Sequence, residues 1–257
     1  MIDKRELFEK ARELKLGLQI VEKDYVLGWL LYGMKDFERL AFKGGTALSK
    51  IYFPKVWRLS EDLDFAFTGD DFAELKDKMS QILDKVSRES GIIFRIKSEF
   101  SNPLYLQLKI GYDAVIGKNW IKVDATKETV MDKAEKKVLK KSYPDYPSFS
   151  VKVESIEEIF SEKVRSLIER TKCRDYFDVW KLCLMDFDKE KLMQLFRKKC
   201  ELKKIKFKGM DGIFPDDIED TLLPYWNQEL GRLLNPLPDL NVVLKELKTR
   251  LKFLESS

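Results

Sequence analysis

The sequence predicts an α+β protein in two parts: an N-terminal domain with a small mixed sheet and a C-terminal domain that is mostly helical. Apolar residues recur at helical spacing within residues 3–37 and again from Ser155 onward. Between these regions, short runs rich in β-branched and aromatic residues alternate with Asn, Pro and Gly turn signals. A charged stretch with two prolines at 136–147 suits a surface connection, so we expect domains at residues 1–150 and 151–257.

The elements of the first domain follow from local patterns. In chain order they are two helices within 3–37, a strand at 41–43, a helix at 47–52, a strand at 59–67, a helix at 71–88, and strands at 92–98, 104–112 and 120–125. Pro54 ends the short helix because proline lacks the amide that a continuing helix needs. The helical domain opens at Ser155, whose side chain can form a capping box with Glu158.

Composition excludes several kinds of chemistry. A chain of 257 residues, 44% of them hydrophobic, can bury a substantial core. The sequence contains no histidine, which excludes Ser-His-Asp and Cys-His nucleophile systems and zinc sites built on histidine. Acid-base or metal chemistry must therefore use carboxylates and lysines. The formal net charge of +4 tolerates a nucleic-acid partner without requiring one.

The cysteines and the hydropathy pattern indicate a cytoplasmic setting. Cys173, Cys183 and Cys200 are odd in number and lack a C-x-x-C spacing, so we expect reduced thiols. The charged N-terminus is followed by helical periodicity and not by an apolar signal region. No stretch approaches the roughly 18 apolar residues of a membrane span, and we expect no membrane association.

Two carboxylates occupy alternate positions of the strand expected at 59–67. Its period of two directs Leu63 and Phe65 to the core, and Asp62 and Asp64 together to the opposite face. Adjacent carboxylates repel each other unless a cation lies between them, and Mg²⁺ both relieves the repulsion and binds nucleotide phosphates. The alternative is a pair of solvent-facing residues, the usual meaning of an isolated Asp-x-Asp.

A glycine turn precedes this strand. Gly44 and Gly45 join the strand at 41–43 to the helix at 47–52, where backbone amides can cradle phosphate oxygens. Glycine allows close approach of the backbone and a positive φ angle. Thr46 either caps the helix or donates its hydroxyl to a phosphate. The turn lacks the spacing of a P-loop or a Rossmann fingerprint, so only its combination with Asp62 and Asp64 is specific.

Four segments in order resemble a known family. Residues 44–50, 58–65, 153–163 and 174–180 are similar to motifs of the AbiEii/AbiGii-type toxin nucleotidyltransferases, within the DNA-polymerase-β-like nucleotidyltransferase superfamily. The link at 53–57 is slightly longer than is usual in the family. The resemblance implies a polymerase-β-like nucleotidyltransferase domain.

The resemblance also implies the roles of residues in the first domain. Asp62 and Asp64 would hold Mg²⁺ or Mn²⁺, and Gly44, Gly45, Thr46 and Lys50 would surround the triphosphate, with Arg58 and Ser60 flanking it. The superfamily often has a third carboxylate on a neighbouring strand. Asp124 fits this position because Ile121 and Val123 lie on the opposite face, although it could equally be a solvent-facing strand residue.

In the helical domain the resemblance singles out Lys163 and Asp175. A Glu-Lys pair on an amphipathic helix usually belongs to a solvated face, but the family implies that Lys163 binds phosphate or takes part in catalysis. Asp175 and Asp178 are three residues apart and share one helix face, which is also consistent with acidic residues favouring a helix N-terminus. The family implies that the helical domain contributes these residues to the active site. Tyr176, Phe177 and Trp180 are assigned to packing.

The implied function is a toxin of a toxin-antitoxin or phage-defence system that transfers a nucleoside monophosphate from a nucleoside triphosphate to an acceptor hydroxyl. RNA, in particular tRNA, is the leading acceptor, and an antitoxin protein is an expected partner. Basic clusters at 136–141, 197–199 and 203–208 could follow an RNA backbone, although lysine-rich faces are usually only solvated. The alternatives are nucleotidylation of a protein and a non-catalytic nucleotide-binding module.

Overall fold

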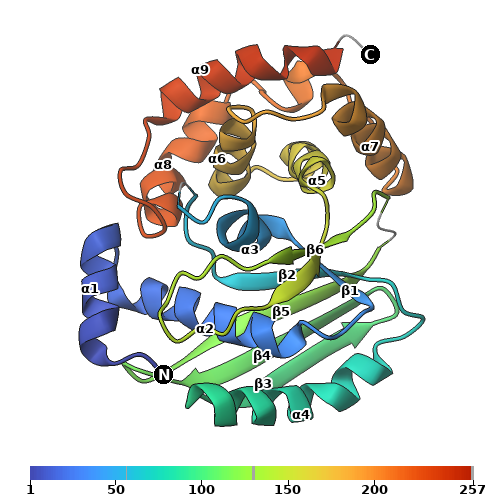
Figure 1. Ribbon diagram of the computed structural model, residues 1–257. Coiled ribbons are helices and arrows are strands. Elements are labelled where there is room, and N and C mark those ends of the chain that lie inside the picture. The colour runs from blue at the N-terminus through green and yellow to red at the C-terminus, as the bar shows by residue number, and fades with distance from the viewer. Residues whose placement is uncertain (56, 129–130, 256–257) are drawn as a thin grey trace. The chain divides into compact units, whose positions relative to one another are not determined.

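The computed structural model describes residues 1–55, 57–128 and 131–255. It divides into two compact units, Met1–Glu154 and Ser155–Ser257. The division lies a few residues after the expected boundary at 150, because residues Ser150–Val153 form a strand of the sheet in the first unit. Figure 1 shows the first unit in blue to green-yellow and the second in yellow to red.

In the described part of the first unit, seven strands form one mixed sheet in the order β3-β4-β5-β2-β1-β7-β6 (Figure 1). The strands are β1 (Leu40–Lys43), β2 (Asp62–Phe67), β3 (Ile93–Asn102), β4 (Tyr105–Asp113), β5 (Lys118–Lys127), β6 (Glu135–Val138) and β7 (Ser150–Val153). The pairs β2·β5 and β1·β7 are parallel, and the other neighbours are antiparallel. The expected α+β fold with a small mixed sheet is confirmed.

The helices of the first unit are α1 (Lys4–Leu14), α2 (Leu18–Met34), α3 (Gly44–Ala47) and α4 (Ala73–Ser90), with a π-helix, η1 (Leu48–Tyr52), after α3. A capping box between Asp3 and Glu6 starts α1. Helix α2 is buried on nearly every side, and Gly33 gives it close contact with Val86 and Ile82 of α4. Helix α4 in turn lies against β3.

Three expectations about this unit are wrong in detail. The basic stretch at 136–141, expected as a loop, begins inside strand β6, which has little apolar alternation of its own and is held by pairing with β7. The helix expected at 47–52 instead starts at Gly44 as α3 and continues as the π-helix η1. The strand expected from residue 59 begins at Asp62.

Among residues 155–255, every regular element of the second unit is a helix. These are α5 (Ile156–Glu169), α6 (Cys173–Leu182), α7 (Lys189–Leu202), α8 (Ile218–Leu230) and α9 (Leu240–Arg250), with short 3₁₀ segments η2 (Met210–Gly212) and η3 (Leu251–Glu255). Ser155 caps α5 by accepting the Glu158 amide at 3.2 Å. The three cysteines are free, and all of them are buried. Within the described residues, no helix is long and apolar enough to cross a membrane.

Candidate active site

Three carboxylates share one face of the sheet where β2 and β5 run parallel. Leu63 and Phe65 are buried, whereas Asp62 and Asp64 are half-buried on the opposite face, which confirms the alternation expected from the sequence. Asp64 is the direct cross-strand partner of Asp124. Because partners in a ladder have side chains on the same face, Asp124 lies beside the Asp62/Asp64 pair.

Two neighbours compensate the charge of these carboxylates. The Tyr105 hydroxyl donates a 2.8 Å hydrogen bond to Oδ1 of Asp124. Burial, together with this hydrogen bond and the charge of Asp124, raises the pKa of Tyr105 above its ordinary value. Nζ of Lys122 lies 3.6 Å from Oδ2 of Asp62, which places a cation next to the pair.

The glycine turn comes within contact of the same carboxylates. Gly44 has a φ angle of 74°, and a Cβ atom there would lie 2.5 Å from Oδ2 of Asp64. A Cβ on Gly45 would lie 2.7 Å from the Arg58 guanidinium. The sequence therefore needs glycine at both positions, because a side chain would displace the carboxylate on one side and the guanidinium on the other.

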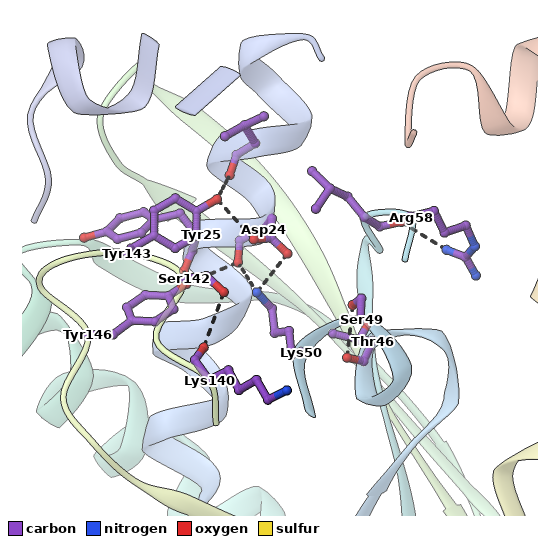
Figure 2. Close-up of polar contacts among 12 residues, drawn as sticks. Asp24, Tyr25, Thr46, Ser49, Lys50, Arg58, Lys140, Ser142, Tyr143 and Tyr146 are labelled. Carbon is purple, nitrogen blue, oxygen red and sulfur yellow. Dashed lines mark hydrogen bonds and ion pairs between the residues drawn. The ribbon is translucent and has the colours of Figure 1, made fainter. Parts of the chain in front are cut away.

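Thr46, Arg58 and Ser60, also expected around the triphosphate, lie at or beside this turn. The Thr46 hydroxyl donates a hydrogen bond to the backbone carbonyl of Asp62 and so ties α3 to β2. Ser49 donates to the Thr46 carbonyl at 3.1 Å, a contact visible in Figure 2. Arg58 and Ser60 are both buried, and Arg58 donates to the Leu59 carbonyl at 3.1 Å. Thr46 therefore ties the turn to β2, and the Arg58 guanidinium lies against Gly45.

Lys50, expected at the triphosphate, is instead enclosed in the first unit. Its Nζ lies 2.8 Å from both Oδ1 and the backbone carbonyl of Asp24 in α2, and only 3% of the residue is exposed. Tyr143 donates to the other carboxylate oxygen of Asp24 at 3.1 Å. Figure 2 shows the Lys50 ammonium directed toward Asp24, with Tyr143 and Tyr146 on the same side. The pair joins η1 to α2.

In the second unit, the three residues singled out by the resemblance meet. Nζ of Lys163 in α5 lies 2.8 Å from Oδ1 of Asp175 and 2.8 Å from Oδ2 of Asp178, both in α6. Arg170, which sequence reasoning missed, places Nε 2.8 Å from Oδ2 of Asp175. The two carboxylates are buried and their spacing of three residues puts both on the face that meets Lys163, as expected for a helix.

The charge state of this cluster follows from its contacts. Burial alone would raise the pKa of Asp175, but the charges of Lys163 and Arg170 outweigh burial and hold the pKa at about 2. Asp175 is therefore ionised near neutral pH. Lys163 lies between the two carboxylates, an arrangement that suits a fixed cation. The aromatic residues Tyr176 and Phe177 are buried, in agreement with the assignment to packing.

A divalent cation suits the donor set on β2 and β5. Carboxylate oxygens are the ligands that Mg²⁺ prefers, and Asp62 and Asp64 present two of them next to a glycine turn without a Cβ atom. Asp124 lies in register with Asp64 but engages Tyr105. Within residues 1–55, 57–128 and 131–255, no three acidic, cysteine or histidine side chains gather as a ready-made metal cluster. The site therefore offers two carboxylates on one sheet face, with a third on the next strand.

One lysine of the basic cluster at 197–199, which could have followed an RNA backbone, is instead buried in ion pairs. Lys199 is 5% exposed, and its Nζ lies 2.7 Å from carboxylate oxygens of both Glu158 and Glu162 in α5. It fastens α7 to α5 and is not available to an RNA backbone. Arg197 and Lys198 remain exposed.

Comparison with known proteins supplies the context of this site. A family profile described as "Nucleotidyl transferase AbiEii toxin, Type IV TA system" matches residues 29–251. The nucleotidyltransferase toxin MenT4 from Mycobacterium tuberculosis is 19% identical with a TM-score of 0.74, over 100% of this chain and 91% of that one. JHP933 from Helicobacter pylori is 21% identical with a TM-score of 0.60, over 94% of each chain. No curated protein sequence matches the chain.

Proposed function

The chain belongs to the AbiEii family of nucleotidyltransferase toxins of type IV toxin-antitoxin systems, and we propose that it transfers a nucleoside monophosphate from a nucleoside triphosphate to an acceptor hydroxyl. The observation that carries this proposal is the contact between the glycine turn and the carboxylate pair. Gly44 approaches Asp64 so closely that even a methyl group would not fit between them. Such a site brings together backbone amides, which can bind phosphate oxygens, and carboxylates, which can bind the cation of a nucleoside triphosphate.

In this reaction the acceptor oxygen attacks the α-phosphate in line, the bond from that phosphorus to the bridging oxygen breaks, and pyrophosphate leaves. Mg²⁺ or Mn²⁺ bound to Asp62 and Asp64 would neutralise phosphate charge and lower the pKa of the attacking hydroxyl. Gly44, Gly45 and Thr46 form the turn that receives the phosphates. Asp124 either completes the cation site or accepts the proton of the acceptor hydroxyl.

Lys163, Asp175 and Asp178 form the second part of the proposed machinery. The two carboxylates hold the ammonium at 2.8 Å each, so its position is set before substrate binds. We assign Lys163 the role of a fixed cation that offsets phosphate charge. Asp175 and Asp178 are positioning residues for Lys163. Lys50 is left out of the phosphate ligands and assigned to support of η1, because Asp24 holds it.

RNA, in particular tRNA, is the acceptor we propose, and a cognate antitoxin protein is the proposed binding partner. The test is incubation of the full chain with each labelled nucleoside triphosphate and either Mg²⁺ or Mn²⁺, in the presence of total RNA and of total protein. Label that enters the RNA pool, and is lost in the Asp64→Asn and Lys163→Met variants, would support the proposal.

Two other results would overturn parts of it. Label in the protein pool alone would identify the chain as a protein nucleotidyltransferase, since the same site can activate a Ser, Thr or Tyr hydroxyl. If no nucleoside triphosphate is consumed with either cation, the chain is a nucleotide-binding module without transferase activity. Wild-type and Lys163→Met proteins would then show the same nucleotide consumption.

A further inference from the structure

The sheet face that carries Asp62 and Asp64 continues across the neighbouring strands to an open edge. In the ladder, Asp62 is opposite Lys122, and Lys122 is opposite Lys109 of β4. A second row of cross-strand partners runs from Asp64 to Asp124 of β5, then to Gln107 of β4 and Phe100 of β3. Because cross-strand partners share a face, both rows lie on the side of the sheet that bears the candidate catalytic carboxylates.

Helix α4 covers the other side of this part of the sheet. Leu108 and Val123, which alternate with the row residues, are buried. At the edge strand, Glu99 and Ser101 face α4, where Lys76 contacts them at 2.6 Å and 2.7 Å. Phe100, between them, therefore points away from α4, and it is 58% exposed.

The open face is positively charged next to the carboxylates. Lys109 and Lys122 lie directly opposite each other, an arrangement of like charges that destabilises a sheet unless anions or aromatic rings compensate it. Lys122 has Asp62 at 3.6 Å. Lys109 Nζ lies 3.9 Å from the centre of the Trp120 ring, in a cation-π contact. Both lysines are half-buried, and 35% of the Lys122 side chain is exposed.

Aromatic rings alternate with these lysines. Trp120 is opposite Gly111. A Cβ on Gly111 would lie 2.8 Å from Cε of Lys97, so the Lys97 side chain lies over this glycine, next to the Trp120 ring. Phe100 lies 6.3 Å from Tyr105, which in turn donates to Asp124. We call Lys97, Phe100, Lys109, Trp120 and Lys122 the sheet-face strip. It begins at the catalytic carboxylates and ends at β3.

We propose that the sheet-face strip binds a single-stranded segment of the RNA acceptor and leads its terminal hydroxyl to Asp62 and Asp64. The inference rests on the proposed function and assigns a place to its acceptor. Lysines along a sheet follow a phosphate backbone, and aromatic rings between them stack on unpaired bases regardless of sequence. A double helix would offer its phosphates but not its base faces, so the rings favour a single strand.

The test is binding of a fluorescent single-stranded RNA ending in a 3′-hydroxyl to the full chain, followed by anisotropy over a series of salt concentrations. We expect Trp120→Ala to raise Kd about tenfold, the effect typical of one stacked base. Lys109→Gln should weaken binding and reduce the slope of log Kd against log salt by about 0.7, the value for one phosphate contact on a single strand. Trp120→Phe keeps an aromatic face and should bind between wild type and Trp120→Ala.

Lys85→Gln is the matched control. Lys85 is an exposed lysine of α4, on the other side of the sheet, and its ammonium also lies over an aromatic ring, 5.8 Å from the centre of Tyr32. The Lys85→Gln substitution removes the same charge as Lys109→Gln and should leave the Kd for RNA unchanged. Far-UV circular dichroism of each variant checks the fold, and Trp120→Phe keeps the test valid if Trp120→Ala unfolds.

The outcomes separate this inference from the proposed function. If the wild type labels RNA but Lys109→Gln and Trp120→Ala bind RNA as well as Lys85→Gln does, the sheet-face strip is not the acceptor site and the transferase function stands. If RNA binding depends on the strip although no nucleotide is transferred, the strip stands and the proposed reaction fails. Labelling of protein alone, with no RNA binding, overturns both the strip and the RNA acceptor, and leaves nucleotide transfer to a protein hydroxyl.

Discussion

Gly44 and Asp64 are in contact across β1 and β2, so that the turn and the carboxylate strand form one structural unit. The φ angle of 74° at Gly44 is strained for any residue with a side chain, and a Cβ there would lie 2.5 Å from Oδ2 of Asp64. The turn therefore fixes the position of the carboxylate as well as the backbone amides. This contact brings together two motifs that are separated along the chain, since Gly44 and Asp64 are 20 positions apart.

The variant Gly44→Ala tests this contact. We expect a loss of about 1–3 kcal/mol in the free energy of unfolding from the left-handed backbone. The displaced Asp64 carboxylate should in addition reduce nucleotide transfer strongly. Gly212→Ala is the control, because that exposed glycine has an ordinary φ angle and its nearest neighbour, Cβ of Lys208, would be 3.8 Å away. Equal activity in the two variants would contradict the proposed role of the turn.

Asp64→Asn separates activity from stability. The amide has nearly the size of the carboxylate but lacks its charge, so nucleotide transfer should fall at least about a hundredfold if a cation is held here. The melting temperature should stay the same or rise, because the repulsion with Asp62 is relieved. Asp84→Asn, an exposed substitution on α4, serves as the control in transfer assays and thermal unfolding. An active Asp64→Asn protein would exclude the proposed cation site.

Lys50→Met tests whether Lys50 supports the turn or binds phosphate. Removing the ammonium leaves Asp24 buried without its cation, and the loss of a buried partner costs about 3–5 kcal/mol of unfolding free energy. Adding Asp24→Asn should recover part of this loss. Lys55→Met, at an exposed lysine of the same segment, should change stability little. A stable Lys50→Met protein with a raised KM for the nucleotide would restore the phosphate role.

Lys199→Met should likewise destabilise the second unit by about 3–5 kcal/mol, because Glu158 and Glu162 would lose the ammonium that lies 2.7 Å from each. The neighbouring exposed Lys198→Met is the control and should unfold like the wild type. Denaturant unfolding measured by circular dichroism compares them. Equal stability of the two variants would show that the buried contacts contribute nothing.

The elements with strong local patterns could be predicted from the sequence. Alternation in β2 placed Leu63 and Phe65 in the core and Asp62 with Asp64 outside, as the structure shows. Strand β6 could not be predicted, because Glu135–Val138 is mostly exposed and exists through pairing with β7. A strand stabilised by its partner leaves little pattern in its own residues.

The roles of individual lysines depend on residues far away along the chain. Lys50 meets Asp24 across 26 positions and Lys199 meets Glu162 across 37, and neither carboxylate is marked by the residues around the lysine. Both lysines therefore looked like solvated or ligand-binding residues. In the same way, Lys109 and Trp120 become neighbours only through the register of β4 and β5. Short patterns define local structure, whereas the choice of charge partners is made by the fold.

Because of Asp175, the free energy of unfolding of the second unit should fall as the pH becomes acidic. Its pKa is held at about 2 in the folded chain against an ordinary value of 3.8, because Lys163 and Arg170 outweigh burial. A carboxyl group whose pKa is lowered in the folded state stabilises the fold, and this stabilisation is fully present at pH values above the pKa of the unfolded state. That contribution, about 2 kcal/mol, is lost as pH falls from about 4 toward 2.

Asp175→Asn should remove this dependence. Urea unfolding followed by circular dichroism at several values between neutral pH and pH 3 should give a steeper loss of stability for the wild type below about pH 4 than for the variant. The exposed substitution Asp216→Asn removes a carboxylate without a buried partner and should keep the wild-type slope. Parallel curves for wild type and Asp175→Asn would mean that Lys163 and Arg170 do not hold Asp175 ionised, and Lys163 would then lack the fixed position that its proposed role requires.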